Sequence, residues 1–176
     1  LFPKRKLADK GEITLKEMLS HFARLRPWIP FYEETLNRKE KPKSRFYKTN
    51  PRSSFLTPVS ENLYLKRNYM DKIFKSIVDS ELIEKLEFKY SDLPFYFLKF
   101  WFEDMYNKPL DLLAEERIFN KLQLVRTMFN PYKKLSLDKI VPSEEDDFFR
   151  YSKLHGYVHD EGAAMLGGIS GHAGLF

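Results

Sequence analysis

The sequence contains no cysteine, which excludes disulfide bonds and thiolate metal sites. It also lacks the G-x-S-x-G turn, a phosphate-cradling glycine loop and the H-E-x-x-H zinc motif. Its longest aromatic-apolar stretch, residues 95–102, is interrupted by Lys99 and is far shorter than the roughly 20 residues of a membrane-spanning helix. We therefore expect no cofactor, no bound metal and no transmembrane segment.

Glycine is scarce and unevenly distributed. Five of the seven glycines lie between residues 162 and 174. Glycine is used where a backbone turns sharply or approaches another backbone closely. Two interpretations stay open: a tight turn between two helices, or a glycine-rich segment, residues 156–176, that lines the wall of a site.

The composition is that of one globular domain, residues 1–176, with 43% hydrophobic and 16% aromatic residues. Thr14 and Glu17 form a T-x-x-E capping box, which predicts a helix that ends near residue 22. Apolar spacing predicts further helices over 68–82, 91–106, 110–119 and 160–166, the second of them capped by Ser91 and buried on most sides. Strand patterns are few, so we expect a mainly α fold.

Two segments are expected to be loops, a basic one at 37–58 and another at 129–150, because both contain prolines and little periodicity. The basic segment has a local charge of +6, whereas the whole chain has +5. The positive charge is therefore confined to one segment. This favours a solvated loop over a nucleic-acid or membrane-surface site, and we expect no nucleic-acid partner.

Tyr90, Ser91 and Asp92 precede the aromatic helix. A tyrosine acts as a base only if its pKa falls well below the ordinary value of about 10, which requires a nearby cation. The alternative is a tyrosine that packs beside the residue capping a helix.

Three segments, in this order, resemble one protein family. They are Ile13-Thr14-Leu15-Lys16-Glu17-Met18-Leu19-Ser20-His21, then Tyr90-Ser91-Asp92, then the C-terminal run with Gly156-Tyr157-Val158-His159-Asp160, Ala163-Ala164-Met165-Leu166-Gly167-Gly168 and Gly171-His172-Ala173-Gly174-Leu175-Phe176. They are similar to the β-lactamase-related serine hydrolases, which include class C β-lactamases and penicillin-binding proteins. They look especially like the form fused behind family 3 glycoside hydrolases in some Bacteroidetes-like bacteria.

This resemblance implies a fold in which an α/β sandwich and an all-helical region enclose the active site. The chain would be a middle fragment that supplies mainly the helical region, and the rest of the polypeptide would be its partner. The family forms an acyl-enzyme on an ester, an amide or a peptidoglycan-type peptide. By analogy, Tyr90 moves the proton and Asp92, at the Asn position of the Y-S-N element, orients the substrate or a lysine. A periplasmic or extracellular location follows from the same likeness.

The family's S-x-x-K nucleophile motif is expected before this segment and its final strand motif after it, so the chain alone is expected to be inactive. A non-catalytic binding or interaction module on the same scaffold is the alternative. Arg24, Pro94 and Gln123 stand where relatives are expected to have glycine. Asp92 also places a negative charge where it opposes a tyrosinate at Tyr90.

Overall fold

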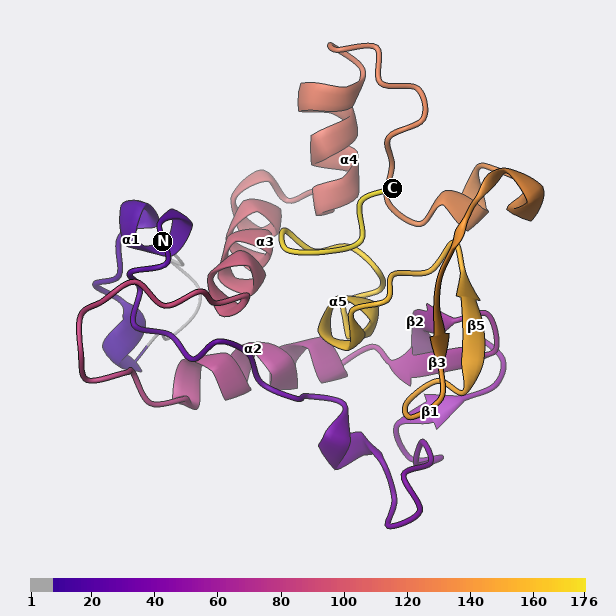
Figure 1. Ribbon diagram of the computed structural model, residues 1–176, viewed down its shortest axis with the longest axis horizontal. Coiled ribbons are helices and arrows are strands. Elements are labelled where there is room, and N and C mark those ends of the chain that lie inside the picture. Colours follow the sequence, from indigo (N-terminus) through magenta and orange to yellow (C-terminus); the bar gives the residue numbers. More distant parts are fainter. Residues whose placement is uncertain (1–7) are drawn as a thin grey trace.

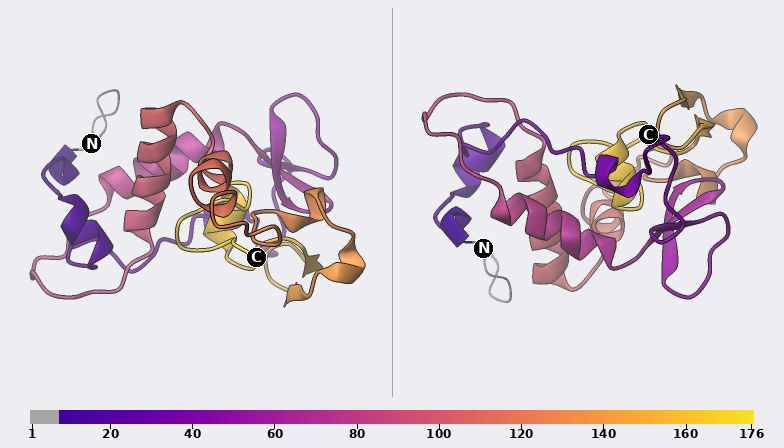
Figure 2. Two further views of the ribbon diagram at one scale, coloured as in Figure 1. Left: turned by 90° about the horizontal axis from the view of Figure 1, so that it is seen from above. Right: turned by 90° about the horizontal axis from the view of Figure 1, so that it is seen from below.

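The computed structural model describes residues 8–176, and residues 1–7 of the expected domain lie outside the described residues. Helix α1 (Leu15–Leu19) lies at one end of the molecule and two small sheets lie together at the other (Figures 1 and 2). The short helix α5 (Glu161–Met165) lies between them and packs on strand β2.

The predicted helices are present. Helix α2 spans Tyr69–Asp79, α3 spans Leu93–Tyr106, and α4 (Leu110–Ala114) continues as one π-helical stretch, Glu115–Phe119. The capping box of α1 is complete, because Thr14 and Glu17 each accept a hydrogen bond from the other's backbone nitrogen. Helix α3 begins two residues after Ser91, whose hydroxyl accepts a hydrogen bond from the Leu93 backbone nitrogen.

The expectation of a mainly α fold is wrong. The chain is mixed α/β, with 33% helix, 15% strand and two antiparallel sheets. The first sheet has the order β1-β3-β2, formed by Tyr47–Lys48, Leu63–Lys66 and Phe55–Ser60. Strand β2 is an edge strand, where a proline such as Pro58 is tolerated. The expected loop 37–58 thus contains β1 and four of the six residues of β2.

The second sheet pairs β4 (Pro142–Asp146) with β5 (Ser152–His155). The expected loop 129–150 therefore contains a strand, and it also contains two short 3₁₀ helices, Pro131–Lys133 and Leu137–Lys139. Two more 3₁₀ helices span Ala8–Lys10 and Glu33–Thr35. These strands escape notice in the sequence because β4 is mostly acidic and both sheets are short.

The core lies between α2, α3 and α5, and it is rich in aromatic rings. Phe74 of α2 meets Phe97 and Phe100 of α3 edge-on, with ring centroids 5.6 and 5.2 Å apart. Lys99 is buried in the same helix, and its amino group lies 2.5 Å from the Glu103 carboxylate. The polar stripe of this aromatic helix is therefore an internal ion pair.

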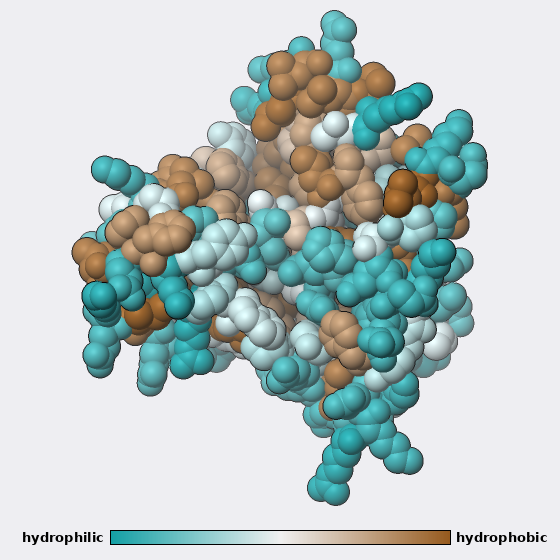
Figure 3. Space-filling model, viewed as in Figure 1, coloured by the Kyte–Doolittle hydropathy of each residue, from teal (hydrophilic) through white to brown (hydrophobic). Residues whose placement is uncertain are grey.

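Apolar side chains remain exposed along α4 and the segment that follows it. They are Leu112, Ile118, Leu122, Leu124 and Val125. Figure 3 shows apolar atoms gathered at the top of the molecule, over α4. Among residues 8–176, none of the helices has both the length and the apolar character that crossing a bilayer requires.

Candidate functional site

A cleft of about 700 Å³ lies between the start of α3, helix α4 and the C-terminal tail, by which we mean residues 166–176. Tyr90 and Asp92 line one side and the tail lines another. The full lining is Tyr90, Asp92, Leu110, Ala114, Ile118, Phe119, Phe129, His159, Asp160, Ser170, Gly171, His172, Ala173, Gly174 and Leu175. This tyrosine cleft brings together the two sequence-predicted site residues and the glycine-rich segment.

The position of Tyr90 and Asp92 is fixed by the segment after α1. The Asp92 backbone nitrogen donates to the Pro27 carbonyl oxygen at 2.9 Å, and the Ser91 hydroxyl donates to the Arg26 carbonyl oxygen at 2.5 Å. The Ser91 backbone nitrogen donates to Nδ1 of His21 at 3.2 Å. A distant part of the chain thus holds the tripeptide at the rim of the cleft.

Tyr90 is 60% exposed, and its ring lies 4.6 Å from the ring of His21. The negative charge of Asp92, followed by partial burial, raises the pKa of Tyr90 above its ordinary value. The expected opposition between Asp92 and a tyrosinate is therefore confirmed in direction. The raised pKa favours the protonated phenol over a tyrosinate.

Two hydrogen bonds join three residues that line the tyrosine cleft. Nε2 of His172 lies 3.0 Å from Oδ1 of Asp160, and Nδ1 of His172 lies 2.9 Å from the Ser170 hydroxyl. The His172 ring stacks on the Tyr96 ring at 4.6 Å. Burial opposes ionisation of Asp160, but the hydrogen bond and charge of His172, together with the hydrogen bond from the Ala163 backbone, outweigh it and lower the pKa of Asp160.

Ser170, His172 and Asp160 stand in the order used to activate a serine nucleophile. Ser170 is only 3% exposed, however, so a substrate carbonyl cannot readily approach its hydroxyl. We interpret these hydrogen bonds as a structural support for the tail. Sequence reasoning missed it, because the three residues form no recognised motif although they lie within thirteen residues of one another.

The tail is also fixed by the segment 128–130. The backbones of Met128 and Phe176 exchange two hydrogen bonds of 3.0 Å, and the buried Asn130 side chain donates to the Gly167 carbonyl oxygen at 2.9 Å. Gly174 has a φ of 102°, and a Cβ there would lie 2.4 Å from the Gly168 carbonyl oxygen. Glycine is therefore required at this close approach.

A buried ion pair positions the residues just before Asp160. The Asp146 carboxylate accepts Nε of Arg150 at 2.5 Å and three backbone nitrogens, from residues 148–150. Arg150 in turn donates to the carbonyl oxygens of Val158 and His159. The acidic run expected to be a loop thus contributes an internal anchor for the tyrosine cleft.

Two of the three positions where glycine was expected adopt a left-handed backbone. The φ angles of Arg24 and Gln123 are 57° and 55°, a region that glycine enters at low cost. Arg24 also donates from Nε to the Ile83 carbonyl oxygen at 2.6 Å. Pro94 lies in the first turn of α3, where proline is favourable, and nothing in the structure requires glycine there.

One S-x-x-K spacing does occur within the chain, between Ser136 and Lys139, although the family's motif is expected before this segment. Both side chains are exposed on the 3₁₀ helix Leu137–Lys139 and its cap, and neither lines the tyrosine cleft. This spacing therefore does not supply a nucleophile to Tyr90. Among residues 8–176, no three His, Asp or Glu side chains gather where they could hold a metal ion.

Comparison with known proteins gives distant relatives. Proteins of Salmonella typhimurium (strain LT2), Salmonella paratyphi B and Salmonella newport, each named "Putative D-alanyl-D-alanine carboxypeptidase", are 28% identical over 197 aligned positions. The match covers 99% of this chain but only 44% of each relative. No model of a known protein family and no solved structure matches. These similarities support a penicillin-binding-protein-like, β-lactamase-related family for the chain.

Proposed function

We propose that the chain forms one wall of the active-site cleft of a serine hydrolase that acts through an acyl-enzyme. The substrate is an ester, an amide or a peptidoglycan-type peptide. One observation carries the proposal: Tyr90, Asp92 and the glycine-rich tail line the same cleft although they are about 80 residues apart in sequence. The relatives named as D-alanyl-D-alanine carboxypeptidases support the peptide substrate and a periplasmic or extracellular location.

In this proposal the attacking serine and its lysine come from a part of a longer polypeptide beyond this chain. The chain spans less than half the length of the curated relatives it matches, which leaves room for such a part. Tyr90 donates a proton to the leaving group, as a protonated phenol can. Asp92 attracts the lysine ammonium, since a carboxylate favours a neighbouring cation. That ammonium would in turn lower the pKa of Tyr90.

Chemical labelling tests the proposal. A longer polypeptide that carries this chain is treated with a fluorophosphonate or a fluorescent penicillin, beside the isolated chain and the Tyr90→Phe variant of the longer form. We expect stoichiometric labelling of the longer form only, slowed about 10²–10⁴-fold by Tyr90→Phe. Tyr106→Phe, on the exposed end of α3, is the matched control and should react normally. Stoichiometric labelling of the isolated chain would contradict the proposal.

A non-catalytic binding module on the same scaffold is the second candidate. The specific observation in its favour is that the charge of Asp92 raises the pKa of Tyr90, opposite to the needs of a tyrosinate base. A longer polypeptide that carries a complete S-x-x-K motif and still resists both probes would establish this alternative. The residues that adjoin Leu1 and Phe176 in that polypeptide also test whether a family 3 glycoside hydrolase domain is attached.

A further inference from the structure

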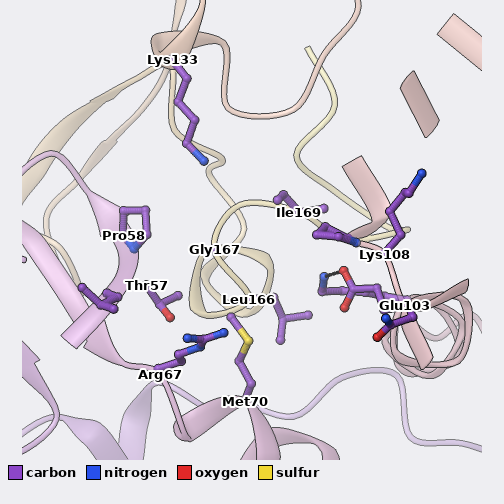
Figure 4. A pocket seen from close by; sticks show the side chains of 14 residues that line it. Thr57, Pro58, Arg67, Met70, Glu103, Lys108, Lys133, Leu166, Gly167 and Ile169 are labelled. Atoms are coloured by element: carbon purple, nitrogen blue, oxygen red, sulfur yellow. Dashed lines mark hydrogen bonds and ion pairs between the residues drawn. The ribbon is translucent and has the colours of Figure 1, made fainter. Parts of the chain in front are cut away.

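A second cleft borders the first residues of the tail. Its volume is about 660 Å³, and it shares no lining residue with the tyrosine cleft. It is lined by β2, the start of α2, the end of α3 and the first residues of the tail (Figure 4). Its lining residues are Leu56, Thr57, Pro58, Arg67, Met70, Lys99, Glu103, Asn107, Lys108, Pro109, Lys133, Leu166, Gly167 and Ile169.

Cations dominate this lining, with Arg67, Lys99, Lys108 and Lys133 against the single carboxylate of Glu103. Two of the four cations are already paired. Lys99 is neutralised by Glu103 at 2.5 Å, and Lys108 lies 2.7 Å from Glu116, which is outside the lining. Figure 4 accordingly shows the Lys108 side chain directed away from the middle of the cleft.

The other two cations remain available. Within residues 8–176, neither Arg67 nor Lys133 has a carboxylate partner, and both side chains are exposed. Figure 4 shows them reaching into the cleft from opposite sides, with Gly167 of the tail between them. Two unpaired cations that face one concave space repel each other until an anion enters it.

The remaining lining residues make part of this cleft apolar. Met70, Leu166 and Ile169 offer apolar contact beside the cations. Met70 belongs to the first turn of α2, an 11-residue helix whose N-cap residue Asn68 makes no side-chain capping bond. The partial positive charge of that helix end adds to the field of Arg67 and Lys133.

We propose that this basic cleft binds a small organic anion, whose carboxylate or phosphate groups contact Arg67 and Lys133 while its apolar part packs on Met70 and Leu166. A guanidinium binds either group through two parallel hydrogen bonds, and a lysine binds it as a point charge. The site is distinct from the tyrosine cleft and does not depend on the acyl-transfer proposal.

Calorimetric titration of the chain with citrate and with inorganic phosphate tests this site and distinguishes the two anion chemistries. Binding of either probe should weaken roughly tenfold in Arg67→Gln and in Lys133→Gln, since each variant loses a hydrogen bond to a charged group. It should also weaken as salt is added. Lys121→Gln removes the same charge from an exposed residue outside both clefts and should leave binding unchanged.

The amide resonances of Gly167 and Ile169 report the location of binding. They should shift on addition of the probe in ¹⁵N-edited spectra of the wild type and of Lys121→Gln, but not in Arg67→Gln. Absence of binding by both probes at about 10 mM, a concentration at which a site of millimolar affinity is filled, would overturn the proposal. An equal loss in Lys121→Gln would do the same, because binding would then follow net charge alone.

Discussion

The Asp160 carboxylate joins two elements through its contact with His172. Its Oδ1 lies 3.0 Å from Nε2 of His172 and 2.6 Å from the Ala163 backbone nitrogen at the start of α5. Nδ1 of His172 faces the Ser170 hydroxyl, so the imidazole links the Asp160 carboxylate to Ser170 in the tail. One carboxylate therefore caps α5 and holds the tail against it.

Loss of this carboxylate should destabilise the chain cooperatively with loss of the imidazole. Asp160→Ala should cost about 2 kcal/mol, from a lost helix cap and a lost hydrogen bond. His172→Phe keeps the stacking on Tyr96 and removes only the polar contacts. Urea denaturation should show that the double variant costs less than the sum of the single ones. Strict additivity would mean that the two side chains are not coupled.

The same carboxylate predicts how stability depends on acid. Burial raises its pKa, but the hydrogen bond and charge of His172 and the hydrogen bond from the Ala163 backbone together outweigh that effect, so the pKa is lowered from 3.8 in the folded chain. The unfolded chain therefore binds the proton first, and the stabilisation is present above about pH 4 and lost as the pH falls through the folded pKa. Asp160→Asn should flatten the fall in the free energy of unfolding below about pH 4. An unchanged slope would show that other carboxyls, such as Asp146, carry the effect.

The charge at residue 92 should control the titration of Tyr90. Asp92→Asn removes the first cause of the raised pKa and restores the neutral amide of the Y-S-N element. We expect the pKa of Tyr90 to fall toward 10.0. Ultraviolet difference titration measures this shift, with Tyr90→Phe variants in both backgrounds to identify the Tyr90 signal among the ten tyrosines. If Asp92→Asn leaves the titration where it was, the electrostatic account of Tyr90 is wrong.

The sequence predicts the helices well because their signals are local. The Thr14–Glu17 box and the aromatic spacing of α3 depend only on neighbours along the chain. The strands are not predicted because the residues that pair in them are far apart in sequence. The backbone of Tyr47 pairs with that of Leu65, and neither residue lies in an alternating run. Half of the first sheet also lies in a segment whose basic charge and prolines are typical of loops.

The residues of the candidate site also divide into those that the sequence predicts and those that it does not. Tyr90, Asp92 and the glycines were found through motifs, whereas Asp160, His172 and the Asp146–Arg150 pair were missed. Isolated carboxylates, imidazoles and guanidiniums carry no sequence signal of burial. Their roles follow from contacts that only the folded chain creates.

The left-handed residues offer a matched pair of substitutions. Gln123→Gly should stabilise the chain by up to about 1 kcal/mol. A side chain in the left-handed conformation costs about 1–2 kcal/mol, and the larger conformational entropy that glycine loses on folding offsets part of the gain. Arg24→Gly relieves the same strain but loses the hydrogen bond to Ile83, so it should give no gain. Thermal denaturation of both variants measures the contrast. A larger gain at Arg24 than at Gln123 would contradict it.

The apolar surface beyond α4 should make the isolated chain self-associate. A monomer seldom exposes a large apolar patch, and Leu122, Leu124 and Val125 are all exposed within four residues of the chain. Val125→Lys should weaken association roughly tenfold, since burial of a valine stabilises a contact by about 1.5 kcal/mol or more. Val141, 82% exposed against 83% for Val125, lies outside this group, and Val141→Lys is the matched control. Sedimentation velocity over a range of concentrations measures both. A wild-type chain that stays monomeric throughout would show that this surface has no tendency to pair, and equal effects of the two lysines would place the contact elsewhere.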